Sequence, residues 1–183
     1  MDKFDLISCL GELNLTDISV NICTMDEIFH FRLDEKLINI MIINTAVGNQ
    51  TLGHYLCVIR SELGIFMFDS FGMRPDFYNQ KLEDYILSYK LPVTVWKGRL
   101  QSFRSLACGC YVMVLIYYIS KYKSVKSAFD IFRVYFNKKY FQNDILVVKL
   151  MYQLFTTLGD CQKILCDPEY TTTNDCIRIC RDT

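Results

Sequence analysis

Long apolar segments and a surplus of one charge are both missing from this chain of 183 residues, whose formal net charge is zero. Its most apolar stretch, between Arg104 and Lys121, is shorter than the roughly 20 residues that cross a bilayer, so we expect no membrane segment. The first five residues, Met1-Asp2-Lys3-Phe4-Asp5, are too acidic and polar for a secretory signal. The sequence therefore predicts an intracellular protein that is not secreted.

Internal repeats, linkers and low-complexity segments are also absent, which favours one domain over an array or a string of modules. Because 51% of the residues are hydrophobic, the chain can build a sizeable core, and disorder of the whole chain is excluded. We expect one domain over residues 1–159 and a cysteine-containing extension over residues 160–183. We expect a monomer.

The nine cysteines are an odd number, and without a secretory signal they are expected as reduced thiols and not as a disulfide framework. Four of them fall in the extension, with a spacing that a tetrahedral zinc site would tolerate: Cys161, Cys166, Cys176 and Cys180. No second signal supports zinc there, so we expect no metal.

The zero net charge hides an uneven distribution. Residues 1–35 hold eight acidic and two basic residues, and residues 90–149 hold eleven basic and two acidic ones. A basic half can attract nucleic acid or an acidic partner, and equally can be a solvated face that attracts the acidic half. The DNA-binding interpretation depends on Lys121, Lys123, Lys126, Arg133, Lys138 and Lys139.

Hydrophobic periodicity predicts an α+β fold, with a small mixed or antiparallel sheet packed against helices. The expected strands cover residues 37–43, 55–60, 65–68 and 91–96. The expected helices cover residues 2–13, 76–89, 108–120, 124–136 and 144–158, the last with Asn143 as its N-cap and Gly159 beyond its end.

The strands around residues 55–60 and 65–68 are joined by the hairpin-sized loop Ser61-Glu62-Leu63-Gly64. Folding this hairpin about its centre places His54 directly opposite Asp69, on the same face and within hydrogen-bond reach. The sequence therefore predicts an imidazole oriented by a carboxylate. By default an isolated histidine is structural, as we expect of His30, and an aspartate there is a turn residue.

Cys108 stands at the start of the uncharged stretch, which reads as a buried central helix. A helix N-terminus gathers unpaired N–H groups and positive potential, which lowers the pKa of a thiol. The Cys108 N–H and the Gln101 side-chain amide are candidate donors to an oxyanion. By default Cys108 and Cys110 are small buried residues and Gln101 is an exposed polar one.

At these residues the chain resembles the adenovirus-type cysteine proteases (adenain), including those of adenovirus-like viruses and Maverick/Polinton-type elements. The matching segments are Met25-Asp26, Asn44-Thr45-Ala46, Gly53-His54, Phe68-Asp69-Ser70-Phe71-Gly72, and Gln101 followed by Ala107-Cys108-Gly109. The resemblance covers roughly residues 5 to 158. It implies a papain-like architecture with Cys108 as nucleophile, His54 as base, Asp69 as third member, and Gln101 with the Cys108 N–H as oxyanion hole.

The resemblance further implies a thiol endopeptidase that cuts viral capsid or core precursors at glycine-containing sites during virion maturation, in the host nucleus or the virion. DNA is then a candidate activator. The chain departs from the family at Tyr55, where a tryptophan is usual, and at Ser70, where a proline is usual. Lys90 aligns near the cysteine that tethers a viral peptide in some members, so we expect activation without a disulfide-linked peptide and no required cofactor.

Two other functions stay open at this stage. Ulp-type isopeptidases, which act on ubiquitin or SUMO-like proteins, share the order His, Asp, Gln, Cys. A protein without enzymatic activity could use the basic stretch to bind nucleic acid or to act as a scaffold.

Overall fold

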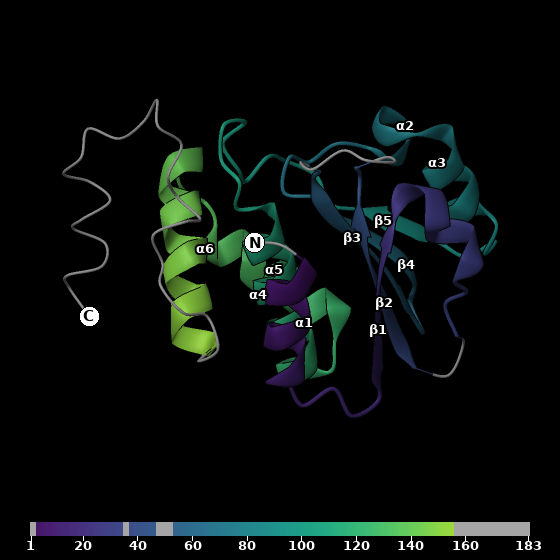
Figure 1. The fold of residues 1–183 in the computed structure, drawn as a ribbon, viewed down its shortest axis with the longest axis horizontal. Helices are drawn as coiled ribbons and strands as arrows, with labels where there is room; N and C mark the ends of the chain where they lie inside the picture. Colours follow the sequence, from purple (N-terminus) through teal and green to yellow (C-terminus); the bar gives the residue numbers. More distant parts are fainter. Residues whose placement is uncertain (1–2, 35–36, 47–52, 156–183) are drawn as a thin grey trace.

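The computed structural model describes residues 3–34, 37–46 and 53–155 (Figure 1). The helices are α1 (Lys3–Gly11), the 3-10 helix η1 (Met25–His30), α2 (Pro75–Tyr78), α3 (Gln80–Leu87), α4 (Cys108–Tyr122), α5 (Val125–Tyr135) and α6 (Tyr140–Leu154). The strands are β1 (Ile18–Thr24), β2 (Ile38–Asn44), β3 (Tyr55–Ser61), β4 (Gly64–Phe68) and β5 (Val93–Val95). The predicted α+β class is confirmed.

The five strands form one mixed sheet in the order β1-β2-β3-β4-β5. The two inner pairings, β2 with β3 and β3 with β4, are antiparallel, and the two outer pairings are parallel. The middle strands β2, β3 and β4 are apolar and buried along most of their length, because both faces of the sheet are covered.

Alternate residues of the strands enter two cores. On one face, Ile40, Cys57 and Phe68 pack with α1, α4, α5 and α6. On the other, Met41, Val58 and Met67 pack with η1 and α3. Figure 1 shows the same three layers, with α4, α5 and α6 to one side of the sheet and α2 and α3 to the other.

Helix α4 begins at Cys108, as predicted, and most of its side chains are buried. It lies against β3, and α5 and α6 cover its other sides. The helix ends where Lys123 takes a left-handed backbone (φ 51°). Because the core surrounds α4, the position of its first residue, Cys108, is fixed. No helix in the described part of the chain is long and apolar enough to cross a membrane.

Several predicted boundaries are wrong. The helix expected over residues 76–89 is two helices, because Asn79 is extended (φ −169°, ψ 140°) and caps α3 by accepting the Lys81 N–H at 2.9 Å. Helix α6 begins at Tyr140, so Asn143 lies inside its first turn and is not its N-cap. The Asn143 amide instead binds the Lys138 backbone and the Leu100 carbonyl. The helix expected to run to residue 158 ends at Leu154, because Phe155 is extended (φ −129°, ψ 119°). Gly159 and the extension over residues 160–183 lie outside the described residues.

The predicted register of the hairpin is also wrong, by two residues. Cys57 pairs with Phe68 and Ser61 with Gly64, which leaves Leu56, and not His54, in line with Asp69. The turn is tighter than expected because Gly64 adopts φ 123°. A shift of two residues keeps each side chain on its face, so His54 and Asp69 are diagonal neighbours on one side of the sheet.

Candidate active site

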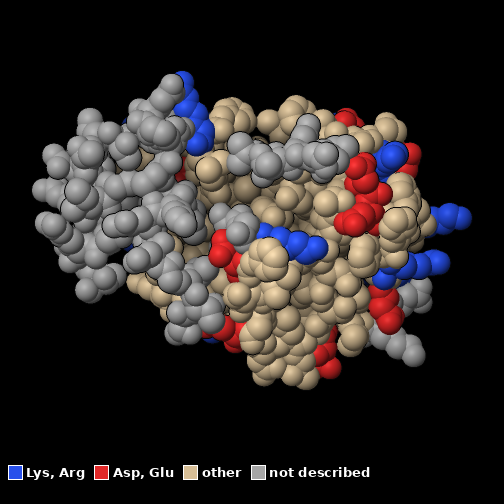
Figure 2. Space-filling view, in the orientation of Figure 1, with Lys and Arg blue, Asp and Glu red and all other residues tan. Residues whose placement is uncertain are grey.

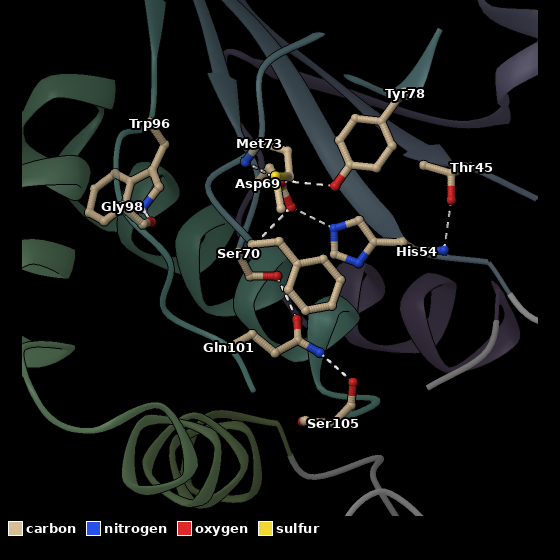
Figure 3. A network of polar contacts seen from close by, with 11 residues as sticks. Thr45, His54, Asp69, Ser70, Met73, Tyr78, Trp96, Gly98, Gln101 and Ser105 are labelled. Carbon is tan, nitrogen blue, oxygen red and sulfur yellow. Dashed lines mark hydrogen bonds and ion pairs between the residues drawn. The ribbon is translucent and has the colours of Figure 1, made fainter. Parts of the chain in front are cut away.

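His54 and Asp69 meet where β3 begins and β4 ends (Figure 3). The imidazole Nε2 lies 2.5 Å from Asp69 Oδ1, and the carboxylate is almost completely buried. Because the residues are diagonal and not directly opposed, the contact depends on the turn that follows β4. In that turn Gly72 has φ 71° and donates its N–H to the Asp69 carbonyl at 3.0 Å.

The Asp69 carboxylate is held by four donors. Its Oδ1 accepts the Phe71 N–H at 3.0 Å in addition to the imidazole, and its Oδ2 accepts the Met73 N–H at 2.8 Å and the Tyr78 hydroxyl at 2.9 Å (Figure 3). Hydrogen bonds from backbone N–H groups and a phenol leave the carboxylate little freedom to turn. The imidazole that it binds is therefore fixed in orientation.

The backbone of His54 is fixed from the other side. Its N–H donates to Thr45 Oγ1 at 2.9 Å, and its carbonyl accepts the Thr45 N–H at 2.9 Å. Asn44 Oδ1 accepts the Ala46 N–H at 2.9 Å, which shapes this turn. A Cβ at Gly53 would lie 2.7 Å from the Ala46 Cβ, so only glycine fits immediately before the histidine.

Two aromatic rings lie parallel to the His54 imidazole. The Phe71 ring centroid is 4.4 Å away at an interplanar angle of 21°, and the Tyr78 ring centroid is 5.8 Å away at 10°. Aromatic faces stabilise a cation stacked against them. Both rings therefore favour the protonated form of the imidazole.

Cys108 faces the same imidazole from the first residue of α4 and is only 7% exposed. Burial alone would raise the pKa of its thiol, but the hydrogen bond with His54, the charge of that imidazole and the N–H groups of Tyr55 and Gly109 lower it below the ordinary value. The N-cap residue Ala107 provides no side-chain acceptor to the helix N-terminus. The sulfur therefore lies where a thiolate is stabilised.

Burial alone would lower the pKa of His54, but its hydrogen bonds with Asp69 and Cys108, together with their negative charges, raise it to about 9. Because Nε2 binds Asp69, Nδ1 is the ring nitrogen that remains for the sulfur. The pair can thus exist at neutral pH as an imidazolium and a thiolate.

Cys110 lies two residues after Cys108 on α4. It has no exposed surface, and burial raises the pKa of its thiol to about 12. Two residues along a helix rotate a side chain by about 200°, so Cys110 points into the core while Cys108 faces His54. Only Cys108 therefore has the geometry of a nucleophile.

Gln101 is completely buried, which corrects the expectation of a partly exposed side chain. Its Oε1 accepts the Ser70 hydroxyl at 2.6 Å, and its Nε2 donates to the Ser105 carbonyl at 2.6 Å (Figure 3). A carbonyl can only accept, so this contact fixes which end of the amide is nitrogen. The second N–H of the amide is not used by this contact.

Ser70 joins the two loops of the site. It follows Asp69 directly, and its carbonyl accepts the N–H groups of Leu100 and Gln101 at 2.8 and 3.1 Å. The structure therefore brings His54, Asp69 and Cys108 into contact and links Gln101 to them through Ser70. A proline at position 70 would lack the hydroxyl that binds Gln101.

The contacts of Tyr78, Phe71, Thr45 and Ser70 with the site were not predicted. The contact of Tyr78 depends on α2 folding back over the turn after β4, and no local pattern signals that. Thr45, Ser70 and Phe71 belong to the segments that carry the family resemblance, but the sequence assigns them no contact. His30 is exposed on η1 and has no metal-site partners, since no group of three potential ligands occurs among the described residues. The four cysteines of the extension lie outside that part of the chain.

No protein-family model matches this chain, and the search of curated proteins finds no match for it.

Proposed function

We propose that the chain is a cysteine endopeptidase of the adenain type with a papain-like architecture. The observation that supports this most directly is a single imidazole that binds a buried carboxylate through Nε2 and faces a helix-N-terminal thiol with its other side. Nucleophile, base and orienting acid in contact are the arrangement that acyl transfer requires.

In the proposed reaction, the Cys108 thiolate attacks the scissile carbonyl, and the carbonyl oxygen becomes an oxyanion. The Cys108 backbone N–H and the free N–H of Gln101 donate to that oxygen. His54 gives its proton to the leaving amine, which leaves an acyl thioester on Cys108. The neutral imidazole then takes a proton from water, and the resulting hydroxide attacks the thioester carbonyl. This step releases the carboxylic acid product and restores the Cys108 thiolate beside the His54 imidazolium.

Asp69 does not touch the substrate in this scheme. It keeps Nε2 occupied, so the proton that moves is the one on Nδ1, and its charge stabilises the imidazolium. The groups needed for the reaction all come from the protein, so we propose that no metal or organic cofactor takes part.

The substrate class rests on the family resemblance. We propose viral capsid or core precursors, cut at glycine-containing sites, with the enzyme acting in the host nucleus or the virion. Lys90, which aligns near the family's tethering cysteine, has no thiol, and this supports activation without a disulfide-linked peptide.

The test is cleavage of a fluorogenic Leu-x-Gly-Gly peptide compared with ubiquitin and ubiquitin-like conjugates. Peptide cleavage that is lost in Cys108→Ala and kept in Cys110→Ala supports the proposal. Turnover of the folded conjugates alone would instead support an isopeptidase of the Ulp type. No turnover of either, with a Cys108 that does not react with alkylating agents, would contradict both.

DNA is proposed as an activator through six basic residues, which lie on α4 and α5, directly after α4 and directly before α6: Lys121, Lys123, Lys126, Arg133, Lys138 and Lys139. All six are exposed, but Lys126 and Arg133 both pair with Asp130, at 2.8 and 3.1 Å, and Lys123 binds the Thr16 carbonyl. On the face in Figure 2, basic and acidic side chains are interspersed. Lys121 and the pair Lys138 and Lys139, which precede α6, are therefore the strongest candidates for phosphate contacts.

A further inference from the structure

The segment between β5 and α4, which carries Gln101, is held by buried groups of α4 and α6. Asp144 Oδ2 accepts the Ser102 N–H at 3.0 Å, and Asn143 Nδ2 donates to the Leu100 carbonyl at 3.2 Å. The Tyr111 hydroxyl lies 3.0 Å from Asp144 Oδ1. These contacts fix the residues on both sides of Gln101.

Asp144 is the centre of this cluster. It has no exposed surface, and it also accepts a hydrogen bond from the Ser105 side chain. Ser105 is the residue whose carbonyl binds the Gln101 amide. One carboxylate thus holds Ser102, Ser105 and Tyr111 at once, and the proposed reaction scheme gives it no task.

We propose that Asp144 is a positioning residue for the oxyanion hole: it fixes Ser102 and Ser105 so that the free N–H of Gln101 points at the developing oxyanion. This inference rests on the proposed function, because it assigns Asp144 a part in that reaction. Asp144 acts through Gln101 and touches no reacting atom. Rates are sensitive to such placement, since a displacement of about 1 Å can cost on the order of 100-fold.

A carboxylate does this because it only accepts, whereas its protonated form must donate at one oxygen. Burial raises the pKa of Asp144 to about 6, against the lowering effects of the Ser102, Tyr111 and Ser105 hydrogen bonds and of the nearby Arg99 charge. Protonation below about pH 6 would remove an acceptor from one of its three donors and loosen the segment.

The test compares Asp144→Asn with Asp130→Asn, a carboxylate on α5 whose side chain is 48% exposed and pairs with Lys126 and Arg133. We expect Asp144→Asn to lower kcat for peptide cleavage on the order of tenfold with little change in KM. The alkylation rate of Cys108 should stay unchanged, because alkylation develops no oxyanion. Asp130→Asn should behave as wild type.

A double-mutant cycle with Gln101→Ala separates positioning from general loosening. If Asp144 acts through Gln101, Asp144→Asn should cost less than about twofold when Gln101 is already alanine. The inference would be overturned if Asp144→Asn lowered kcat by the same factor in the Gln101→Ala background as in wild type, or if Asp144→Asn alone had the kcat of wild type. Tyr111→Phe, which removes a hydroxyl shared between Asp144 Oδ1 and the Leu100 carbonyl, provides a milder second variant and should also lower kcat.

Amide hydrogen exchange gives a readout that needs no substrate. Exchange over residues 100–106 should be faster in Asp144→Asn than in wild type, while α4 stays protected. An inactive wild type would contradict the proposed function and not the anchoring, which the exchange rates would still decide. Unchanged exchange in the variant would refute the anchoring itself.

Discussion

Cys108 and Cys110 should differ by at least about a thousandfold in reactivity towards iodoacetamide at pH 7. With a pKa of about 12, Cys110 is a thiolate in on the order of 10⁻⁵ of the molecules. An ordinary thiol near 9 is a thiolate in about 10⁻², and the Cys108 pKa lies below that value. Since the thiolate is the nucleophile, the ratio of these fractions sets the lower limit.

The assay must distinguish two sulfurs in one tryptic peptide, because trypsin cuts after Arg104 and Lys121. Fragment ions that separate residue 108 from residue 110 will assign the label. His54→Ala should slow labelling of Cys108, since the thiolate loses its hydrogen bond and its positive partner. His30→Ala is the matched control, because His30 is the other histidine of the chain and is exposed on η1.

Two results would refute this reasoning. Labelling of Cys110 before Cys108 would mean that the orientation of α4 is wrong at its first turn. Equal labelling rates in wild type and His54→Ala would mean that the imidazole does not stabilise the thiolate.

Three further results are expected. Gln101→Ala should cut turnover by roughly 10²–10³, and it should also destabilise the fold by about 1–3 kcal/mol because it leaves the buried Ser70 hydroxyl without its acceptor. Gln80→Ala, at an exposed glutamine, should change neither the turnover nor the stability of the fold. In Cys108→Ala the hydrogen bond and charge of Cys108 no longer raise the pKa of His54, while those of Asp69 remain, so the free energy of unfolding should fall with rising pH from about 6.5 up to a folded pKa below the wild-type value, by at most about 1.4 kcal/mol per pH unit. In wild type the free energy of unfolding should be nearly independent of pH over the same range, because the unfolded chain binds one proton on the thiol where the folded chain binds one on the imidazole. Chemical denaturation at several pH values measures this dependence in wild type and in Cys108→Ala. An equal dependence on pH in the two proteins would contradict the ion pair. Duplex DNA should stimulate cleavage less as salt rises, and stimulation that is independent of salt would argue against phosphate contacts.

Local patterns predicted the elements that carry the site. The β3–β4 hairpin follows from two short apolar runs around a glycine, and the start of α4 follows from the uncharged stretch after Arg104. His54, Asp69 and Cys108 could be found because each lies at the end of such an element. The exact register could not, since the sequence pattern does not show whether Ser61 and Gly64 belong to the loop or pair with each other, as they do in the structure.

The contacts that support the site could not be predicted from the sequence, for a related reason. Tyr78, Ser70 and Asp144 contact the site across loops, and their partners are decided by how α2 and α6 pack and not by their neighbours in sequence. Asn143 shows the difficulty directly. Its position before an apolar run is typical of an N-cap, but its amide is used to hold Leu100 on a distant segment.

The distances along the chain between these partners bear on when the site can form during synthesis. Ser70 and Gln101 are 31 residues apart, and Ser102 and Asp144 are 42 apart. The Gln101 segment therefore gains its Asp144 anchor only after the start of α6 has been made, later in synthesis than His54, Asp69 and Cys108. In the proposed peptidase, a chain that ends before α6 would lack the Asp144 anchor, whose loss is expected to lower kcat on the order of tenfold, so full activity requires the last described helix to dock.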